Sequence, residues 1–146
     1  MSPEANKAIS RRWVEEVFSN GNLAVADEIV APNHVNSGPA ALPGLPNGPE
    51  GGIMIVTFWR TAFPDLHFTI DEQIAESDTV MTRWTATGTQ TGELAFMPPT
   101  GKSTTVTGVL IDTFANGVIA HTWAIFDQFG LMQQLGLIPA HGPSGS

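Results

Sequence analysis

Cysteine is absent from this chain of 146 residues, and charged side chains are scarce, at 14% of the total. The absence of cysteine excludes a disulfide framework and any chemistry that uses a thiolate. Lysine and arginine together number 6 against 14 acidic residues, which gives a net charge of −8. The basic residues form no cluster, and an acidic chain repels phosphate backbones, so we expect no nucleic-acid partner.

Long apolar runs are also missing, since none approaches the roughly 20 residues that a membrane-spanning helix needs. Pro3, Glu4 and Asn6 stand where a signal peptide would carry first basic and then apolar residues. We therefore expect a cytoplasmic protein that does not interact with membranes.

Two familiar cofactor motifs can be set aside. The 4 histidines lack the spacing of metal ligands. Gly101-Lys102-Ser103 resembles the end of a phosphate-binding loop, but Phe96 stands where that loop needs its first glycine. We expect neither a metal site nor another cofactor.

Apolar residues make up 42% of the sequence, and in its first half they follow a helical period. Start and stop signals predict three helices, at residues 2–20, 23–30 and 49–63. Between the last two lies a segment rich in proline and glycine, residues 33–52. It is either a linker or a lid over a functional site, and we favour the lid because the flanking halves are too small to stand alone.

The second half is rich in Thr, Val, Ile and Trp, which is typical of strands. Asn116-Gly117 is a hairpin turn, because both residues tolerate a positive φ. We expect strands at residues 67–75, 79–90, 102–114 and 118–127, then a short helix at 128–137. This order predicts an α+β fold: a cone-shaped α+β barrel in which a curved antiparallel sheet and about three N-terminal helices enclose one pocket. We expect residues 1–140 to form a single domain and residues 141–146 a flexible tail.

The last expected strand carries the most informative pattern. Its side chains alternate between two faces, so His121, Trp123, Ile125 and Asp127 share one face. A carboxylate on an apolar face has a raised pKa, as a general acid or base near neutral pH requires. Asp127 and His121 are therefore the candidate catalytic residues. Alternatively, Asp127 caps the helix that begins at Gln128, and the two roles are compatible because capping would fix the carboxylate in place.

The other candidate pocket residues are aromatic, apolar or polar side chains from the lid entrance, the third helix and three strands. Most of the third helix is expected to be core, with some side chains left to line the pocket. We expect ligand contacts from His34, Asn36, Met54, Phe58, Trp59, Phe63, Trp84, Ile111, Thr113 and Trp123. Alternation leaves open whether the Ile111 and Thr113 face or the Asp112 face of its strand points inward. It also leaves open whether Arg83 pairs with a buried acid or is solvated.

Several segments together resemble one known family, in their order and over nearly the whole chain, from about Asn6 to Gly136. They are Pro64-Asp65-Leu66, the run from Arg83 to Thr89, Thr91-Gly92-Glu93, Pro98 to Lys102, the strand ending at Trp123 and Asp127, and Gln133-Gln134-Leu135-Gly136. The chain resembles the SnoaL-like polyketide cyclases of the nuclear transport factor 2-like superfamily.

The resemblance implies a cone-shaped fold and homodimers or homotetramers that form through the sheet. It also implies a pocket for a small apolar or aromatic ester, and intramolecular aldol ring closure without metal or cofactor. The family's catalytic aspartate matches Asp127, which would remove a proton and return it to the new alkoxide. The chain departs from the family at Thr113 and at Ser37, two positions where the family has, or often has, histidine.

Three functions therefore compete. The first is cyclisation or a related isomerisation, with Asp127 as the general acid/base. The second is water addition as in epoxide hydrolases of the same superfamily, which would need Arg83 and a second acid such as Asp112 to face Asp127. The third is non-catalytic binding of an apolar small molecule.

Overall fold

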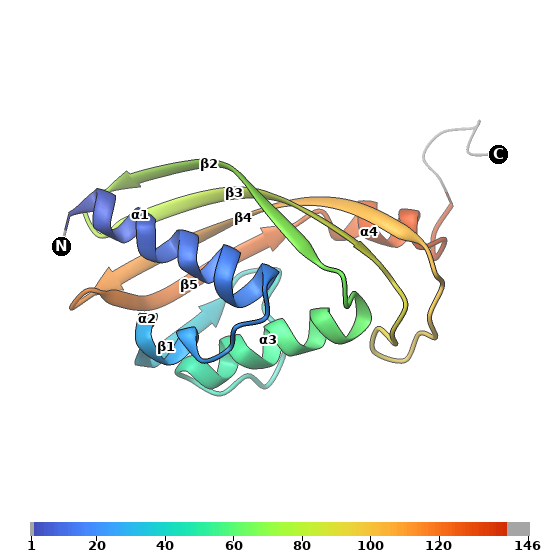
Figure 1. Ribbon diagram of the computed structural model, residues 1–146, viewed down its shortest axis with the longest axis horizontal. Helices are drawn as coiled ribbons and strands as arrows, with labels where there is room; N and C mark the ends of the chain where they lie inside the picture. Colours follow the sequence, from blue (N-terminus) through green and yellow to red (C-terminus); the bar gives the residue numbers. More distant parts are fainter. Residues whose placement is uncertain (1, 140–146) are drawn as a thin grey trace.

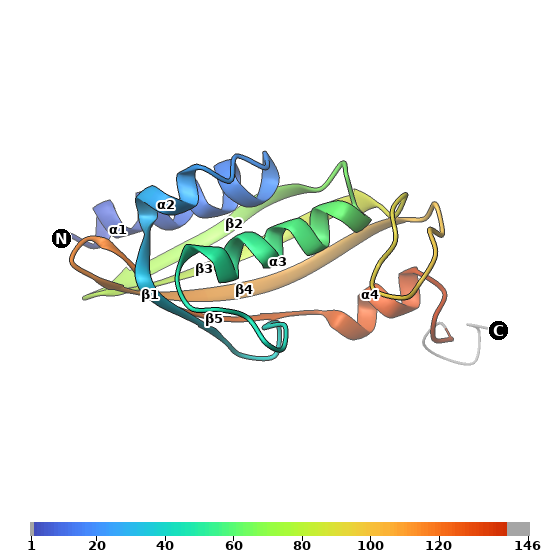
Figure 2. The same cartoon turned by 90° about the horizontal axis from the view of Figure 1, so that it is seen from below.

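A computed structural model describes residues 2–139, and these form a curved five-stranded sheet with helices on one face (Figures 1 and 2). The strands are β1 (Val30–Ser37), β2 (His67–Glu76), β3 (Thr79–Thr89), β4 (Ser103–Ala115) and β5 (Val118–Phe126). The helices are α1 (Pro3–Arg12), the π-helical segment η1 (Trp13–Ser19), α2 (Val25–Ile29), α3 (Pro49–Ala62) and α4 (Gln128–Gln134). The expected tail, residues 141–146, lies outside the described residues.

The predicted α+β class is confirmed, and the sheet is curved but not closed into a barrel. Its strand order is β1-β5-β4-β3-β2, and β2 to β5 form an antiparallel meander. The four strands predicted from the second half of the chain are correct to within a residue at each end. They were predictable because β-branched residues alternate along them and Asn116-Gly117 fixes the last hairpin.

Strand β1 is a correction, because we expected its residues to belong partly to a helix and partly to the lid. It pairs in parallel with β5, so Val35 lies opposite His121, and the register shifts between Val30 and Val35. Pro32 lies within that shift and has no N–H to donate to a ladder, which restricts such a strand to a sheet edge or a bulge. The irregular strand therefore lacks the alternation from which the other four were predicted.

Helices α1, η1, α2 and α3 pack on the inner face of the sheet, and α4 lies at the far end from the N-terminus (Figure 2). The main core includes Val14, Val17, Val56, Val80 and Ile119, all almost completely buried. No helix among residues 2–139 has both the length and the apolar character needed to span a membrane.

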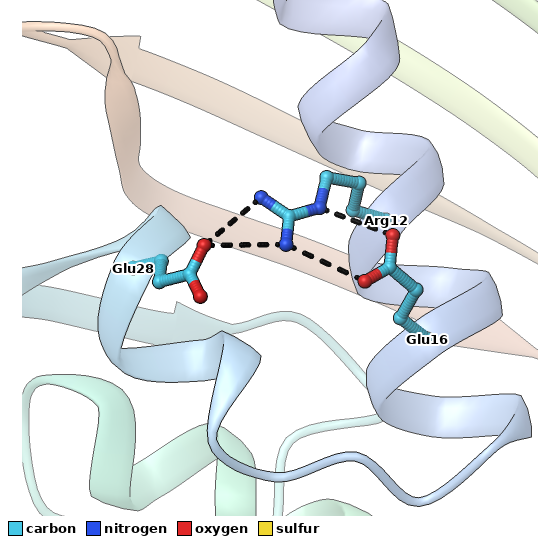
Figure 3. Close-up of polar contacts among 3 residues, drawn as sticks. All are labelled: Arg12, Glu16 and Glu28. Atoms are coloured by element: carbon cyan, nitrogen blue, oxygen red, sulfur yellow. Dashed lines mark hydrogen bonds and ion pairs between the residues drawn. The ribbon is translucent and has the colours of Figure 1, made fainter.

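Arg12 joins the N-terminal helices at the surface (Figure 3). Its guanidinium donates to Glu16 on η1 at 3.1 Å and to Glu28 on α2 at 3.2 Å. Exposed ion pairs of this kind contribute little to stability, so Arg12 links η1 to α2 without stabilising the fold strongly.

Candidate functional site

A cavity of about 120 Å³ lies between the inner face of the sheet and the helices. Its wall is mostly apolar, and its aromatic members are Trp13, Phe18, Trp59, Phe63, Phe68, Trp84 and Phe126. The polar residues of the wall are Asn36, Ser37, Thr87, Thr104 and Thr122. Among residues 2–139, no acidic, basic or histidine side chain lines it. Such a site suits a small apolar molecule with a few oxygen atoms that accept or donate hydrogen bonds.

The segment after β1 closes one side of this cavity. Ala40 and Ala41 line the wall, and the Ala40 N–H donates to the Ala124 carbonyl at 2.9 Å. Gly38 allows this approach: it has φ of +89°, and a Cβ at this position would lie 2.6 Å from the Ala124 oxygen. The segment expected to be a lid is thus partly cavity wall.

The two faces of β5 are the reverse of what the sequence suggested. Thr122, Ala124 and Phe126 line the cavity, whereas Trp123 is 37% exposed on the outer face. His121 is half-buried and is not part of the wall, but its Nε2 lies 2.9 Å from Oγ of the wall residue Ser37. The expectation failed because Trp123 and Ile125 are more apolar than Thr122 and Ala124.

Asp127 is exposed and acts as the N-cap of α4. Its carboxylate accepts a hydrogen bond from the Gly130 N–H at 2.9 Å, and it does not line the cavity. The capping alternative considered from the sequence is therefore the arrangement seen. The face of β5 that points inward is instead the one of Thr122, which lies opposite Asp112 in β4 and donates a hydrogen bond to it.

Of the residues expected to contact a ligand, four lie in the cavity wall: Asn36, Trp59, Phe63 and Trp84. Their contact with a ligand remains a prediction. The others lie elsewhere. Met54 is 50% exposed, Phe58 packs beside Trp59, and His34 is buried behind the wall. Ile111 pairs with Trp123, and Thr113 with His121, so both belong to the outer face.

A chain of buried polar side chains lies behind the cavity wall, and the sequence did not predict it. Asp112 is completely buried. It accepts hydrogen bonds from Ser10 and Thr122, each at 2.7 Å, and Thr122 in turn lies 2.8 Å from Nε2 of His34. We call these four residues, Ser10, His34, Asp112 and Thr122, the polar chain. Of the four, only Thr122 also lines the cavity.

Burial shifts both titratable members of the polar chain toward their neutral forms. It raises the pKa of Asp112 to about 6, although the hydrogen bonds from Thr122 and Ser10 act in the opposite direction. Burial also lowers the pKa of His34 to about 4, with a smaller contribution from nearby His121. Neither shift comes from an ion pair, so both reflect desolvation of the charged form.

Three residues near this chain have buried polar atoms without a hydrogen-bond partner. They are Nδ1 of His34, Nδ2 of Asn36 and both amide atoms of Asn6, which is completely buried one helical turn before Ser10. Buried polar atoms usually have partners, so the polar chain and its surroundings have unused hydrogen-bonding capacity, and of the three residues Asn36 alone lines the cavity. Ser10 and Asn6 could have been found from the sequence as polar positions on the apolar face of α1.

The arrangement required for epoxide-hydrolase-like chemistry is not present. Arg83 is about half exposed on the outer face, where it pairs with Asp71 and Glu72 at 3.8 and 3.5 Å. Asp112 faces inward and Asp127 caps α4, so the three side chains do not surround a common water site. In the part of the chain described, no group of three or more histidine or acidic side chains is placed to hold a metal ion.

Comparison with known proteins agrees with this fold. The chain matches the family model of SnoaL-like polyketide cyclases over residues 8–135. It is similar in structure to TsrD from Streptomyces laurentii, with 24% identity and a TM-score of 0.84 over 94% of this chain and 99% of that one. No curated protein sequence matches it.

Two further solved structures share more of the sequence, and both proteins are provisionally classed as polyketide cyclases. One, from Acidithiobacillus ferrooxidans, is 30% identical with a TM-score of 0.79, over 94% of this chain and 99% of its own. The other, IdmH from Streptomyces antibioticus, is 29% identical with a TM-score of 0.76, over 90% of this chain and 98% of its own.

Proposed function

Because this chain belongs to the SnoaL-like polyketide cyclase family, we propose that it is a cyclase-like enzyme acting on a small apolar or aromatic ester. The reaction would be ring closure, or a related isomerisation, by acid/base chemistry inside the cavity. The observation that carries the proposal is the aromatic cavity wall with its few hydroxyl and amide groups.

The cavity supports this chemistry mainly by holding and orienting the substrate. Flat rings would stack between the indoles of Trp59 and Trp84 and the aromatic side chains beside them. The amide of Asn36 and the hydroxyls of Ser37 and Thr122 would bind the substrate's carbonyl oxygens. Alignment of two carbonyl-bearing arms of one molecule can supply much of the rate of an intramolecular reaction.

The reaction itself needs only one proton to leave and return. A base removes a proton from the carbon between two carbonyl groups, and the resulting enolate carbon attacks a second carbonyl carbon of the same molecule. A carbon–carbon bond forms, and the new alkoxide takes the proton back. Substrate and product have the same composition, so the chemistry calls for no co-reactant.

Non-catalytic binding is the second candidate, and one observation favours it: among the described residues, no titratable side chain touches the cavity. The same ligands would then bind without conversion.

The oligomer expected from the family would cover the apolar outer face of the sheet, where Trp123 lies opposite Ile111 and Val109 opposite Ile125.

A binding and turnover experiment tests the proposal. The ligands would be aryl β-keto methyl esters that carry a second carbonyl within ring-closing distance, followed by chromatography and mass spectrometry. Cyclisation gives a new species of unchanged mass, whereas water addition gives a heavier one. A carrier would bind these esters and return them unchanged.

A matched pair of variants locates the binding. Ala124→Leu places three additional carbons in the cavity and should weaken ester binding about 5- to 150-fold, because overpacking a filled site costs about 1–3 kcal/mol. Ala115→Leu makes the same change at an exposed position of β4 and should leave binding unchanged. Equal effects of the two substitutions would contradict the assignment of the cavity as the binding site.

A further inference from the structure

The polar chain is an unusual feature of this core. Asp112 is completely buried, yet no ion pair among residues 2–139 includes it. A leucine would fill the same place without the desolvation penalty of a buried carboxylate. A buried acid present despite that penalty, directly behind an apolar cavity, is a candidate functional group.

The surroundings of Asp112 contain hydroxyls and amides rather than countercharges. Helix α1 contributes Ser10, with Asn6 one turn earlier, and its nearby Lys7 pairs with Glu4 at 3.7 Å. In β3 the residue paired with Asp112 is Val80. The remaining titratable groups are His34, which is reached through Thr122, and His121 on the other face of β5.

The hydrogen bonds of the polar chain all donate toward Asp112. While Asp112 is ionised, Thr122 donates its only hydroxyl proton to Oδ1 of Asp112. In the 2.8 Å contact between His34 and Thr122, Nε2 of His34 must then carry a proton and donate it to Oγ1 of Thr122. His34 therefore holds the Thr122 hydroxyl oxygen from behind and directs its proton toward Asp112.

We propose that Thr122, Asp112 and His34 form the proton-transfer unit of the cavity, in which Thr122 contacts the substrate and Asp112 acts through it. A substrate proton passes to Oγ1 of Thr122 as the hydroxyl proton passes to Oδ1 of Asp112. This leaves an enolate and a neutral Asp112, and the reverse transfer returns the proton to the product alkoxide. His34 is a positioning residue. The inference rests on the proposed function, because it assigns the base for that reaction.

The probe for this step is 5-nitrobenzisoxazole, whose ring opens when a base removes its carbon-bound proton. The N–O bond breaks and a coloured 2-cyano-4-nitrophenolate forms, so the rate of proton removal is read by absorbance. The wild-type rate should rise with pH and reach half of its maximum near pH 6, where Asp112 loses its proton. A structural role for Asp112 would produce no such profile.

Substitutions test the roles of the Thr122 hydroxyl and the Asp112 carboxylate separately from their effects on folding. Thr122→Val and Asp112→Asn should each lower the rate about 100-fold or more, the usual contribution of a positioned acid or base. Thr122→Ser, which keeps the hydroxyl, should retain most of the rate. If Asp112→Asn does not fold, the Thr122→Val and Thr122→Ser pair decides the question.

The protein contains a matched control pair on the outer face of the sheet. Thr85 donates to Asp71 at 2.6 Å, which is the same Thr–Asp pair in an exposed setting. Asp71→Asn and Thr85→Val should leave the rate unchanged. Loss of the rate in Asp127→Asn together with its retention in Thr122→Val would overturn the inference in favour of the helix-capping carboxylate.

Binding of 5-nitroindazole, which has a similar shape but no N–O bond, distinguishes this inference from the proposed function. Binding without faster ring opening in the wild type would overturn the proton-transfer unit and leave a ligand-binding cavity. Absence of both would overturn the inference and the proposed function together. Loss of ring opening in Thr122→Val with unchanged 5-nitroindazole affinity would support the inference.

Discussion

Removing the carboxylate of Asp112 should change how the stability of the protein depends on pH. The pKa of this group rises from 3.8 when unfolded to about 6 when folded, a difference worth about 3 kcal/mol. The folded state holds the proton more tightly than the unfolded chain. Its contribution is therefore present below pH 4 and is lost as the pH rises to about 6.

His34 should act in the opposite direction over almost the same range. Its pKa falls from 6.5 when unfolded to about 4 when folded, which is again worth about 3 kcal/mol. Because the folded state holds His34 neutral, stability is lost as the pH falls from 6.5 toward 4. In the wild type the two contributions nearly cancel, and each single variant should reveal the other.

Urea unfolding at several pH values between about 4 and 7 measures these contributions as differences from the wild type. From the low to the high end of this range, the free energy of unfolding of Asp112→Asn should rise by about 3 kcal/mol relative to wild type, and that of His34→Gln should fall by about 3 kcal/mol. The double variant, in which both contributions are removed, should show no net trend. A flat difference curve for Asp112→Asn would mean that the folded state does not desolvate this carboxylate, and would refute the reasoning.

Three other substitutions test separate parts of the structure. Asp127→Ala should lower stability by about 1 kcal/mol through loss of the α4 cap, and Asp127→Asn should cost much less because Asn also caps; thermal melts compare them. Gly38→Val should destabilise by more than about 1 kcal/mol and weaken ester binding, since a Cβ would meet the Ala124 carbonyl; an unchanged melting temperature would contradict this. Trp123→Lys should lower the molar mass by light scattering if copies pair through the outer face, and an unchanged mass would argue against that interface.

The sequence predicted most of the sheet because its information there is local. Alternating β-branched residues and the Asn116-Gly117 turn define four strands, and the helix of residues 49–63 has clear start and stop signals. Strand β1 has neither kind of signal. Pro32 interrupts its ladder, and its partner β5 lies far along the chain, so its pairing depends on tertiary contacts.

The candidate site was less predictable, and β5 explains why. Hydrophobicity normally identifies the buried face of a strand, but the cavity-lining face of β5 carries the small or polar side chains of Thr122 and Ala124 beside Phe126. The more apolar Trp123 then lies on the outer face. The sequence of β4 alone did not show whether Asp112 points toward the core or toward the outer face. Its contacts with Ser10 and Thr122 join segments that are distant in sequence.

The central claim is that the cavity under the sheet binds an aromatic ligand, and the tryptophans test it directly. Trp13, Trp59 and Trp84 line the cavity, whereas Trp123 lies on the outer face and serves as an internal control. Titration with 5-nitroindazole, followed by NMR of the indole N–H signals, should shift the first three and leave Trp123 unchanged. A shift confined to Trp123 would place the ligand on the outer face and contradict the account.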